Sequence, residues 1–258
     1  MNIHPSAIID PSASLHESVT VGPHSIIEGN TEIGEGTVIA SNVRIYAGTR
    51  IGQHNRIDHG VALGCEPQDL GFDRNCNSGL VIGDHNQFRE NMNISRGSKE
   101  GHMTRIGNHN YFMSLTHVAH DVVFGDRNVM TQSAIIAGHC HVGNRCFISG
   151  LVAVHQNVNI GDFAMVAGLA KIVKDVPPYA TIDGNPATVI GTNVVAMRRA
   201  GIDQDTRSAI KRAYKTIYHS GLSLAQALEQ LESEVHGCEI ASIIEFFKQS
   251  KRGVTTHR

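Results

Sequence analysis

Several chemically active side chains recur in the central part of the chain at a nearly constant interval. His120 is followed 18 positions later by Gly138, and 36 positions later by Gln156. The complete group consists of His117, His120, Asp121, Gly138, His139, His155 and Gln156. A single histidine would more often be an ordinary turn residue. If the backbone repeats its path at this interval, however, these side chains form one short column.

Within this group, His120 and Asp121 are the most reactive pair. A carboxylate beside an imidazole fixes the tautomer of the ring and stabilises the imidazolium that forms when the ring accepts a proton. Gly138, one repeat further along, would bring a backbone N–H close to a developing oxyanion. Together these features indicate base-assisted acyl transfer.

A hydrophobic residue at every sixth position supplies the repeat that the column requires. This rhythm runs without a miss from Ile3 to Leu63, resumes from Ile82 to Ile94, and continues from Ile106 to Ile172. Such hexads are typical of a parallel β-helix, whereas a sandwich of short strands would need irregular turn spacing. Three hexads make one triangular coil, which rises by about 4.8 Å.

The hexads predict a mainly β fold. Hexapeptide proteins resemble one another in coiling with a left hand, and we expect the same hand here. The expected architecture is a left-handed parallel β-helix of hexapeptide repeats followed by a C-terminal α-helical domain. Glycine often follows the rhythmic residue, as at Gly22, Gly34 and Gly52. Because glycine tolerates positive φ angles, we expect these residues to form the corners of the coils.

Two stretches interrupt the rhythm, near residues 64–80 and 96–105. We expect both to leave the coil as loops that build a binding face, with a decorative insertion as the alternative. The rhythm stops after Ile172, where Pro177 and Pro178 are expected to end the coils because proline cannot donate to a β ladder.

The sequence therefore divides into a β-helix domain, residues 1–190, and a helical domain, residues 191–258, joined by a linker through 184–186. Helical spacing predicts two apolar faces, made of Ile210, Ala213, Tyr214 and Ile217 and of Leu224, Ala227, Leu228 and Leu231. Ser223 and Gln226 have the spacing of a capping box that opens a helix.

Composition predicts a cytoplasmic protein without stable membrane insertion. The chain has 258 residues and a net charge of −2, and no apolar run approaches a membrane span or a signal peptide.

Its five cysteines form no C-x-x-C pair, and Cys140 and Cys146 are expected to be core thiols. Residues 191–258 carry 10 Lys/Arg against 7 Asp/Glu, a weakly basic surface that suits an acidic protein partner, with an ordinary solvated surface as the alternative. We expect no nucleic-acid partner.

The chain resembles the UDP-N-acetylglucosamine acyltransferases of lipid A biosynthesis. Motifs typical of that family occur in family order and cover nearly the whole chain. They are Pro-Gln-Asp-Leu at 67–70, Ala-His-Asp at 119–121, Ala-Gly-His at 137–139, Ala-Val-His-Gln at 153–156, Asp-Val-Pro-Pro-Tyr at 175–179, Gly-Asn-Pro-Ala-Thr at 184–188, Met-Arg-Arg-Ala-Gly at 197–201 and Ala-Tyr-Lys-Thr-Ile-Tyr at 213–218.

The resemblance implies transfer of an R-3-hydroxyacyl group from acyl carrier protein to the 3-OH of UDP-N-acetylglucosamine, the first step of lipid A biosynthesis. The acyl group would arrive on the phosphopantetheine of the carrier protein, so no metal or other cofactor is expected. By this resemblance His120 is the general base, Asp121 orients it, and the Gly138 amide stabilises the oxyanion. The implied substrate-binding residues are Gln68, Asp69, His117, His139, His155, Gln156, Asn193, Arg198 and Arg199. Of these, Asn193 and Arg199 would hold the nucleotide end, and Arg198 would meet the carrier protein.

The family also implies an acyl-chain slot and a homotrimer with active sites between subunits. The residue that limits chain length corresponds to Gly168, flanked by Met165 and Ala167. Gly168 leaves room for a long chain, so we expect a preference for about fourteen carbons over ten, although Met165 could shorten the slot.

Three departures from the family pattern leave other functions open: Gly71 where lysine is usual, Ser95 where histidine is common, and Val195 where an acidic residue is frequent. They allow a UDP-3-amino sugar as acceptor, with an amide as product. A different class, a zinc-dependent hexapeptide carbonic anhydrase, would use histidines five positions apart, a spacing that His54 and His59 share. A non-catalytic binding module is the remaining alternative.

Overall fold

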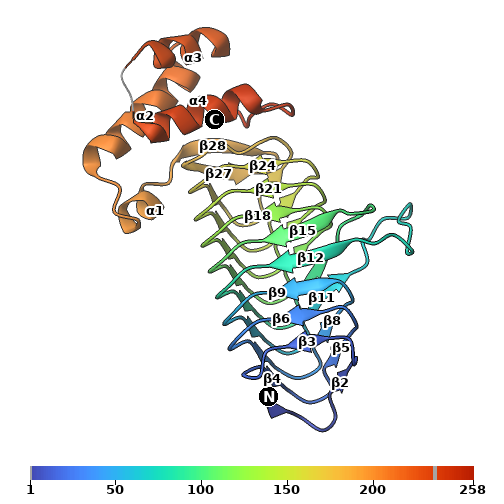
Figure 1. The fold of residues 1–258 in the computed structure, drawn as a ribbon. Helices are drawn as coiled ribbons and strands as arrows, with labels where there is room; N and C mark the ends of the chain where they lie inside the picture. The colour runs from blue at the N-terminus through green and yellow to red at the C-terminus, as the bar shows by residue number, and fades with distance from the viewer. Residues whose placement is uncertain (1, 235–236) are drawn as a thin grey trace.

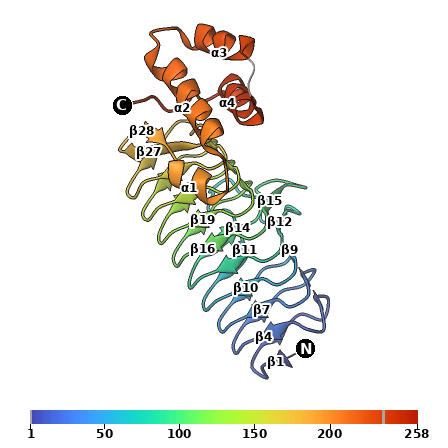
Figure 2. The same ribbon diagram turned by 90° about the vertical axis from the view of Figure 1, so that its left-hand side faces the viewer.

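The chain folds into a long triangular prism of short parallel strands, with a group of helices at one end (Figures 1 and 2). The structure is a computed structural model that describes residues 2–234 and 237–258. Successive strands visit three sheets in turn, so each coil of the prism contributes one strand to each sheet. The hexad rhythm therefore predicted the coil correctly.

The three sheets are named A, B and C in the order in which the chain enters them. Sheet A contains β1 (Asn2–Ile3), β4 (Thr20–Val21), β7 (Val38–Ile39), β10 (Arg56–Ile57), β13 (Gln87–Phe88), β16 (Tyr111–Phe112), β19 (Val129–Met130), β22 (Phe147–Ile148), β25 (Met165–Val166), β27 (Ala180–Gly184) and β28 (Ala187–Thr192). Sheet B contains β2 (Ile8–Ile9), β5 (Ile26–Ile27), β8 (Arg44–Ile45), β11 (Ala62–Cys65), β14 (Asn93–Ser95), β17 (His117–Val118), β20 (Ile135–Ile136), β23 (Ala153–Val154) and β26 (Lys171–Ile172). Sheet C contains β3 (Ser14–Leu15), β6 (Glu32–Ile33), β9 (Thr49–Ile51), β12 (Gly79–Ile82), β15 (Met103–Ile106), β18 (Val123–Phe124), β21 (His141–Val142) and β24 (Asn159–Ile160).

The rhythmic hydrophobic residues point into the prism and stack between coils. Phe88 lies on Phe112 with ring centroids 5.3 Å apart, and both rings are fully buried. Each hexad directs one large rhythmic side chain inward, and a residue two positions earlier, such as Val19, Ser25 or Thr31, is buried beside it. The core is therefore a continuous stack of aliphatic, aromatic and smaller side chains. Burial of such side chains is the main stabilising term for a fold with strands this short.

The two interruptions leave the prism at the same edge, where sheet B turns into sheet C (the B–C edge). One loop connects β11 with β12 and the other connects β14 with β15, and both project from the prism in Figure 1. Each loop lengthens the coil that contains it. Ile57 therefore pairs with Phe88, and Phe88 with Phe112, and in both pairs the sequence separation is larger than three hexads. From Ile106 to Ile172 the step of three hexads is regular.

The expectation that the glycines after the rhythmic residue form the corners is wrong. Their φ angles are not positive; the positive angles occur two residues later, as at His24, Gly36 and His54. Gly22 is needed for space instead, because a Cβ there would lie 2.7 Å from the Ala40 carbonyl of the next coil. Close stacking of backbones, rather than turn conformation, selects glycine at this position.

The prolines do not end the coils. Just before them, Val176 bridges Ile160 of the preceding coil, and beyond them β27 pairs in parallel with β25. Pro177 and Pro178 fall in a turn, where no ladder N–H is required, so the ladder continues past them. The expected linker at 184–186 is likewise the tip of the antiparallel hairpin between β27 and β28, with a cis peptide bond before Pro186.

In the part of the chain that the structure describes, four helices follow the prism: α1 (Val194–Arg199), α2 (Gln204–His219), α3 (Leu224–Ser233) and α4 (Cys238–Gln249). The predicted apolar face of α2 is buried, and the capping box of Ser223 and Gln226 is present. Leu224, expected on the apolar face of α3, is instead 45% exposed, because it is the first residue of the helix. The Tyr214 hydroxyl donates to the Pro178 carbonyl at 2.5 Å and so joins α2 to the end of the prism. In the described ranges, no helix has the length and apolar character that crossing a membrane requires.

Candidate active site

The B–C edge collects most of the predicted catalytic group into one column. His120 follows β17, Gly138 follows β20 and Gln156 follows β23, all in sheet B. These strands pair in steps of three hexads, His117 with Ile135 and Ile135 with Ala153, so the three turn residues lie above one another. The column expected from the spacing is therefore present, and the two inserted loops leave the same edge in the coils just below it.

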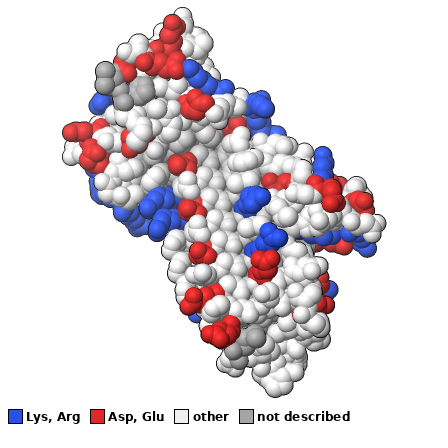
Figure 3. Space-filling model, in the orientation of Figure 1, with Lys and Arg blue, Asp and Glu red and all other residues white. Residues whose placement is uncertain are grey.

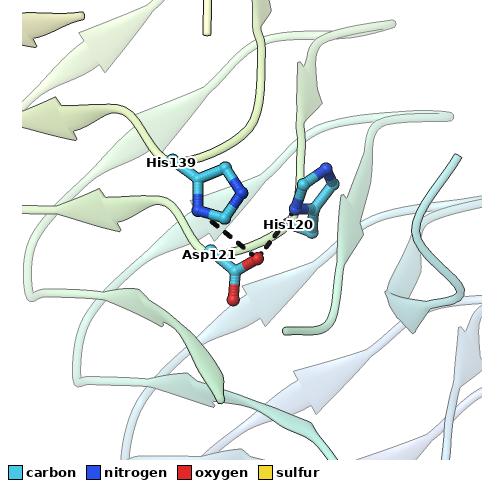
Figure 4. A group of neighbouring side chains, drawn as sticks. All are labelled: His120, Asp121 and His139. Carbon is cyan, nitrogen blue, oxygen red and sulfur yellow. Dashed lines mark hydrogen bonds and ion pairs between the residues drawn. The ribbon is translucent and has the colours of Figure 1, made fainter. Parts of the chain in front are cut away.

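Two histidines point at one carboxylate in the centre of the column (Figure 4). His120 Nδ1 lies 2.8 Å from Asp121 Oδ2, and His139 Nδ1 lies 3.7 Å from the same oxygen. The two imidazole rings are 5.0 Å apart between centroids and meet edge to face. Asp121 and His139 both have positive φ angles, so they occupy the tight second position of consecutive turns, which brings their side chains together.

Asp121 is held as an anion by the second inserted loop. The Ser98 backbone N–H donates to both carboxylate oxygens at 3.2 Å, and His102 Nδ1 lies 3.1 Å from Oδ1. The side chain is only 8% exposed, and this burial opposes ionisation. The hydrogen bonds from Ser98, His120 and His102 outweigh it and lower the pKa of Asp121 to about 2. Because the carboxylate then only accepts hydrogen bonds, His120 Nδ1 carries a proton and its Nε2 is free to accept one.

Ser98 and His102 are site residues that the sequence reasoning missed. They lie 23 and 19 positions before Asp121, so the rule of three hexads does not connect them. Only the break in the hexad rhythm at residues 96–105 could have indicated them, because a loop inserted next to a catalytic turn can fold back onto that turn.

Gly138 is required for the position of the His120 ring. A Cβ on residue 138 would lie 2.6 Å from His120 Cε1 and 2.7 Å from its Nε2. Among the described residues no acceptor pairs with the Gly138 N–H, so this N–H stands free beside the imidazole. Glycine thus admits the ring and leaves a hydrogen-bond donor next to it.

His117 and His155 flank the column on either side. His117 Nδ1 lies 2.6 Å from Asn93 Oδ1; burial, together with the nearby His120, lowers the pKa of His117, so its ring is neutral near pH 7. His155 Nδ1 accepts a hydrogen bond of 2.9 Å from the Arg252 guanidinium, a contact that the sequence did not indicate. The neighbouring Gln156 is exposed at the same edge.

A second group of predicted residues lies elsewhere, over sheet A. Met165, Asn193 and Arg199 line a cavity of about 610 Å³ together with Arg127 and Arg145. Lys and Arg side chains gather on the surface beside α1 in Figure 3. Asn193 also caps α1, because its side chain accepts from the Ala196 N–H at 3.1 Å and donates to the Phe163 carbonyl at 2.8 Å. Arg198 is exposed in the last turn of α1.

The other predicted residues stand apart from both groups. Gln68 and Asp69 lie on the first inserted loop, where Asp69 Oδ1 accepts from the Gly71 N–H at 2.9 Å. Ala167 and Gly168 follow β25, at the edge where sheet A turns into sheet B (the A–B edge). The chain makes two coils and two thirds between His120 and Gly168, so within one chain these residues lie at different edges and do not share a slot.

The histidine pair expected for a carbonic anhydrase does not share one turn. His54 lies between sheets C and A and stacks on His85, with ring centroids 5.1 Å apart. His59 lies at the A–B edge, where its Nδ1 is 2.9 Å from the Ser41 hydroxyl. The two rings belong to different edges of the prism and cannot bind one ion within this chain.

Comparison with known proteins places this geometry in a family. A family model described as UDP N-acetylglucosamine O-acyltransferase, domain 2, matches residues 175–255. The acyl-(acyl-carrier-protein)–UDP-N-acetylglucosamine O-acyltransferase of Leptothrix cholodnii is 43% identical to the chain over 260 residues, covering 98% of each protein. The chain belongs to the UDP-N-acetylglucosamine O-acyltransferase family.

Solved structures of UDP-N-acetylglucosamine O-acyltransferases have the same fold as this member of the family. The enzyme from Moraxella catarrhalis matches with a TM-score of 0.92 and 42% identity, over 99% of this chain and 100% of that one. The corresponding structure from Acinetobacter baumannii gives a TM-score of 0.93 and 38% identity, over 98% and 99%. The expected fold class, a left-handed parallel β-helix followed by C-terminal helices, is thereby confirmed, as is the acyltransferase family that the motifs indicated.

Proposed function

We propose that this chain transfers an R-3-hydroxyacyl group from acyl carrier protein to the 3-OH of UDP-N-acetylglucosamine. Membership of the O-acyltransferase family supports this reaction, and the His120–Asp121 pair carries the proposal structurally because it supplies a base with a fixed tautomer. The product would be the first intermediate of lipid A biosynthesis. We place the reaction in the cytoplasm, with the acyl group delivered on phosphopantetheine and no further cofactor.

In the proposed mechanism, His120 Nε2 accepts the proton of the sugar hydroxyl as its oxygen attacks the thioester carbon. Asp121 stabilises the imidazolium that results, and the free N–H of Gly138 binds the oxyanion of the tetrahedral intermediate. When the intermediate collapses, the carbon–sulfur bond breaks and His120 returns the proton to the leaving thiolate. The thioester is already activated, so the protein mainly has to align hydroxyl, base and carbonyl.

The remaining predicted residues position the substrates. The sugar would contact His117, His139, Gln156 and Asp69, with Gln68 and His155 at the margins of the site. Asn193 and Arg199 would hold the nucleotide, and the guanidinium fork of Arg199 suits its phosphates. Arg198 would contact the acidic carrier protein. The β-helix domain, residues 1–190, thus carries the base, and the helical domain, residues 191–258, holds the nucleotide.

The separation of the two groups supports a homotrimer with shared sites. In one chain the base lies at the B–C edge, while Arg199 and Met165 lie over sheet A. Leu151 and Leu169 stand one above the other at the A–B edge, 60% and 71% exposed, with positive φ angles that are unusual for bulky residues. A neighbouring subunit would cover such apolar turns. It would also bring a second chain's Gly168, Met165 and Ala167 to the acyl chain held near His120.

Replacement of the base tests this function. His120→Ala is expected to lower turnover by roughly 10²- to 10⁴-fold in an assay of acyl transfer from R-3-hydroxyacyl carrier protein to UDP-N-acetylglucosamine. The melting temperature should hardly change, since the imidazole lies in a turn outside the hydrophobic column. His141→Ala, at an exposed ring on β21, is the matched control. Full activity of the His120 variant would refute the proposed base, and faster turnover of the 3-amino sugar analogue would change the proposed acceptor.

A further inference from the structure

We propose that His120, Asp121 and His139 form a binding site for a divalent transition metal ion such as Zn²⁺, and that an ion bound there stops acyl transfer. The site itself follows from the geometry of the three side chains. The inhibition rests on the proposed function, because it assumes that His120 is the base.

The three side chains present ligand atoms at suitable separations. One ligand atom from each residue can be chosen so that all lie within 4.8 Å of one another. Asp121 Oδ2 is 2.8 Å from His120 Nδ1 and 3.7 Å from His139 Nδ1. Zinc bonds of about 2.0–2.1 Å in a tetrahedral arrangement place neighbouring ligand atoms about 3.3 Å apart. These two separations lie on either side of that value, so small movements of the side chains bring the carboxylate oxygen and the two imidazoles around one ion.

The surroundings hold these ligands in place. Ser98 and His102 also bind the Asp121 carboxylate, as outer-shell partners of a metal-binding carboxylate do. The backbone N–H of His139 donates to the backbone carbonyl of His120 at 3.1 Å. This hydrogen bond holds the turn that carries His139 against the turn that carries His120. The two rings meet edge to face, so they approach the carboxylate from different directions (Figure 4).

The ligand set determines which ions fit. Two imidazoles and one carboxylate are typical ligands of zinc and of other late first-row metals, whereas Mg²⁺ and Ca²⁺ prefer oxygen alone. The His139 side chain is 39% exposed, so solvent can reach the site and water can fill a fourth position. Three protein ligands and one water make a complete tetrahedral shell.

An ion at this place would disable the base through its tautomer. In the working enzyme, His120 Nδ1 carries its proton toward Asp121, and Nε2 is the free acceptor. A metal ion on Nδ1 requires that nitrogen to be unprotonated, so the neutral ring carries its proton on Nε2. The atom that should accept the proton of the sugar hydroxyl is then occupied, and the Asp121 carboxylate is shared with the ion.

Direct binding measurements test the site. Tag-free protein, first freed of metals with a chelator, is titrated with Zn²⁺ by calorimetry and with Co²⁺ by absorption spectroscopy. We expect one ion per chain in the wild type and a loss of affinity of about tenfold or more in His139→Gln, which removes one ligand. His141→Gln, an exposed histidine two residues further along, should bind as the wild type does. Circular dichroism confirms that the variants are folded.

Acyl transfer measured on the same samples tests the inhibition. Wild-type activity should fall in proportion to the zinc bound and return when a chelator is added. Equal zinc affinity and stoichiometry in His139→Gln and wild type would overturn the site, and full activity of the zinc-loaded enzyme would overturn the inhibition. The calorimetric result stands even if the chain transfers no acyl group, so a failure of the proposed function is distinguishable from a failure of the metal site.

Discussion

The His120 imidazole can stand beside Asp121 only because residue 138 has no side chain. Gly138→Ala would place a Cβ 2.6 Å from the ring, and the ring, being the movable partner, must turn away. We expect turnover to fall by about a hundredfold, since an ångström of misplacement costs that much. The melting temperature should stay within about 2 °C, because Gly138 does not have a positive φ angle that an alanine would strain.

Gly150→Ala is the matched control for this prediction. Gly150 occupies the same hexad position at the A–B edge, where an added Cβ would meet its nearest neighbour, the Gln132 carbonyl, at 3.3 Å. The melting temperature of this variant should likewise stay within about 2 °C of that of the wild type, which tests the stability half of the prediction. A Gly138→Ala enzyme with full turnover would show that the ring does not need its observed position.

The residues that the sequence could identify are those whose spacing equals one coil. His120, Gly138 and Gln156 follow one another at intervals of three hexads, and the structure stacks them. Ser98 and His102 belong to an insertion, so no periodic rule connects them with Asp121, and only the folded loop shows that they hold its carboxylate.

At the scale of the elements, the hexad predicts which side chains enter the prism, because the inward direction is fixed by sterics repeated in every coil. Cys140 and Cys146 confirm this: both are buried, and their thiols donate to carbonyls of the next coil, those of His155 and Gly161.

The prolines of the sequence did not predict where the β-helix ends. Whether a proline interrupts a ladder depends on whether it falls in a strand or in a turn, and Pro177 and Pro178 fall in a turn.

The buried thiols give a test of this packing. Burial raises the pKa of Cys140 to about 11 and of Cys146 to about 12, against an ordinary value of 9.0. Alkylating reagents attack the thiolate, so at pH 8 both residues should stay unlabelled in the native protein while the exposed Cys238 reacts. Peptide mass spectrometry identifies the labelled sites, and unfolding in denaturant should expose all five thiols.

The raised pKa values of Cys140 and Cys146 also determine how the stability of the fold changes with pH. Raised folded-state values mean that the protonated thiols stabilise the fold fully below pH 9, and that this stability is lost as the pH rises through 11 to 12. Rapid labelling of Cys146 in the native protein at pH 8 would contradict the close packing of the coil interior.

At the scale of the whole molecule, the proposed catalytic group and the proposed nucleotide group lie on different parts of the prism. His120 is at the B–C edge and Arg199 lines the cavity over sheet A. Sequence spacing placed His120 correctly relative to its own column. It gave no information on the distance to Arg199, because that residue follows a hairpin and a helix rather than a further coil.

This separation predicts that two inactive variants restore each other. His120→Ala and Arg199→Ala should each have little activity alone. If each site takes its base from one subunit and its arginine from the neighbour, some sites in mixed trimers combine both wild-type residues. For equal amounts of the two chains, about one quarter of the sites are intact, because each of the two subunits supplies the required residue half of the time.

Co-expression of the two variants, followed by purification of mixed and unmixed trimers together and an acyl-transfer assay, measures this fraction. The double variant co-expressed with each single variant is the control, since neither combination can create an intact site. Light scattering must give a mass of three chains of 27.9 kDa. Mixed trimers no more active than the separate variants would mean that each chain completes its own site. The distance between His120 and Arg199 in one subunit would then have to close by a movement of the helices rather than by assembly.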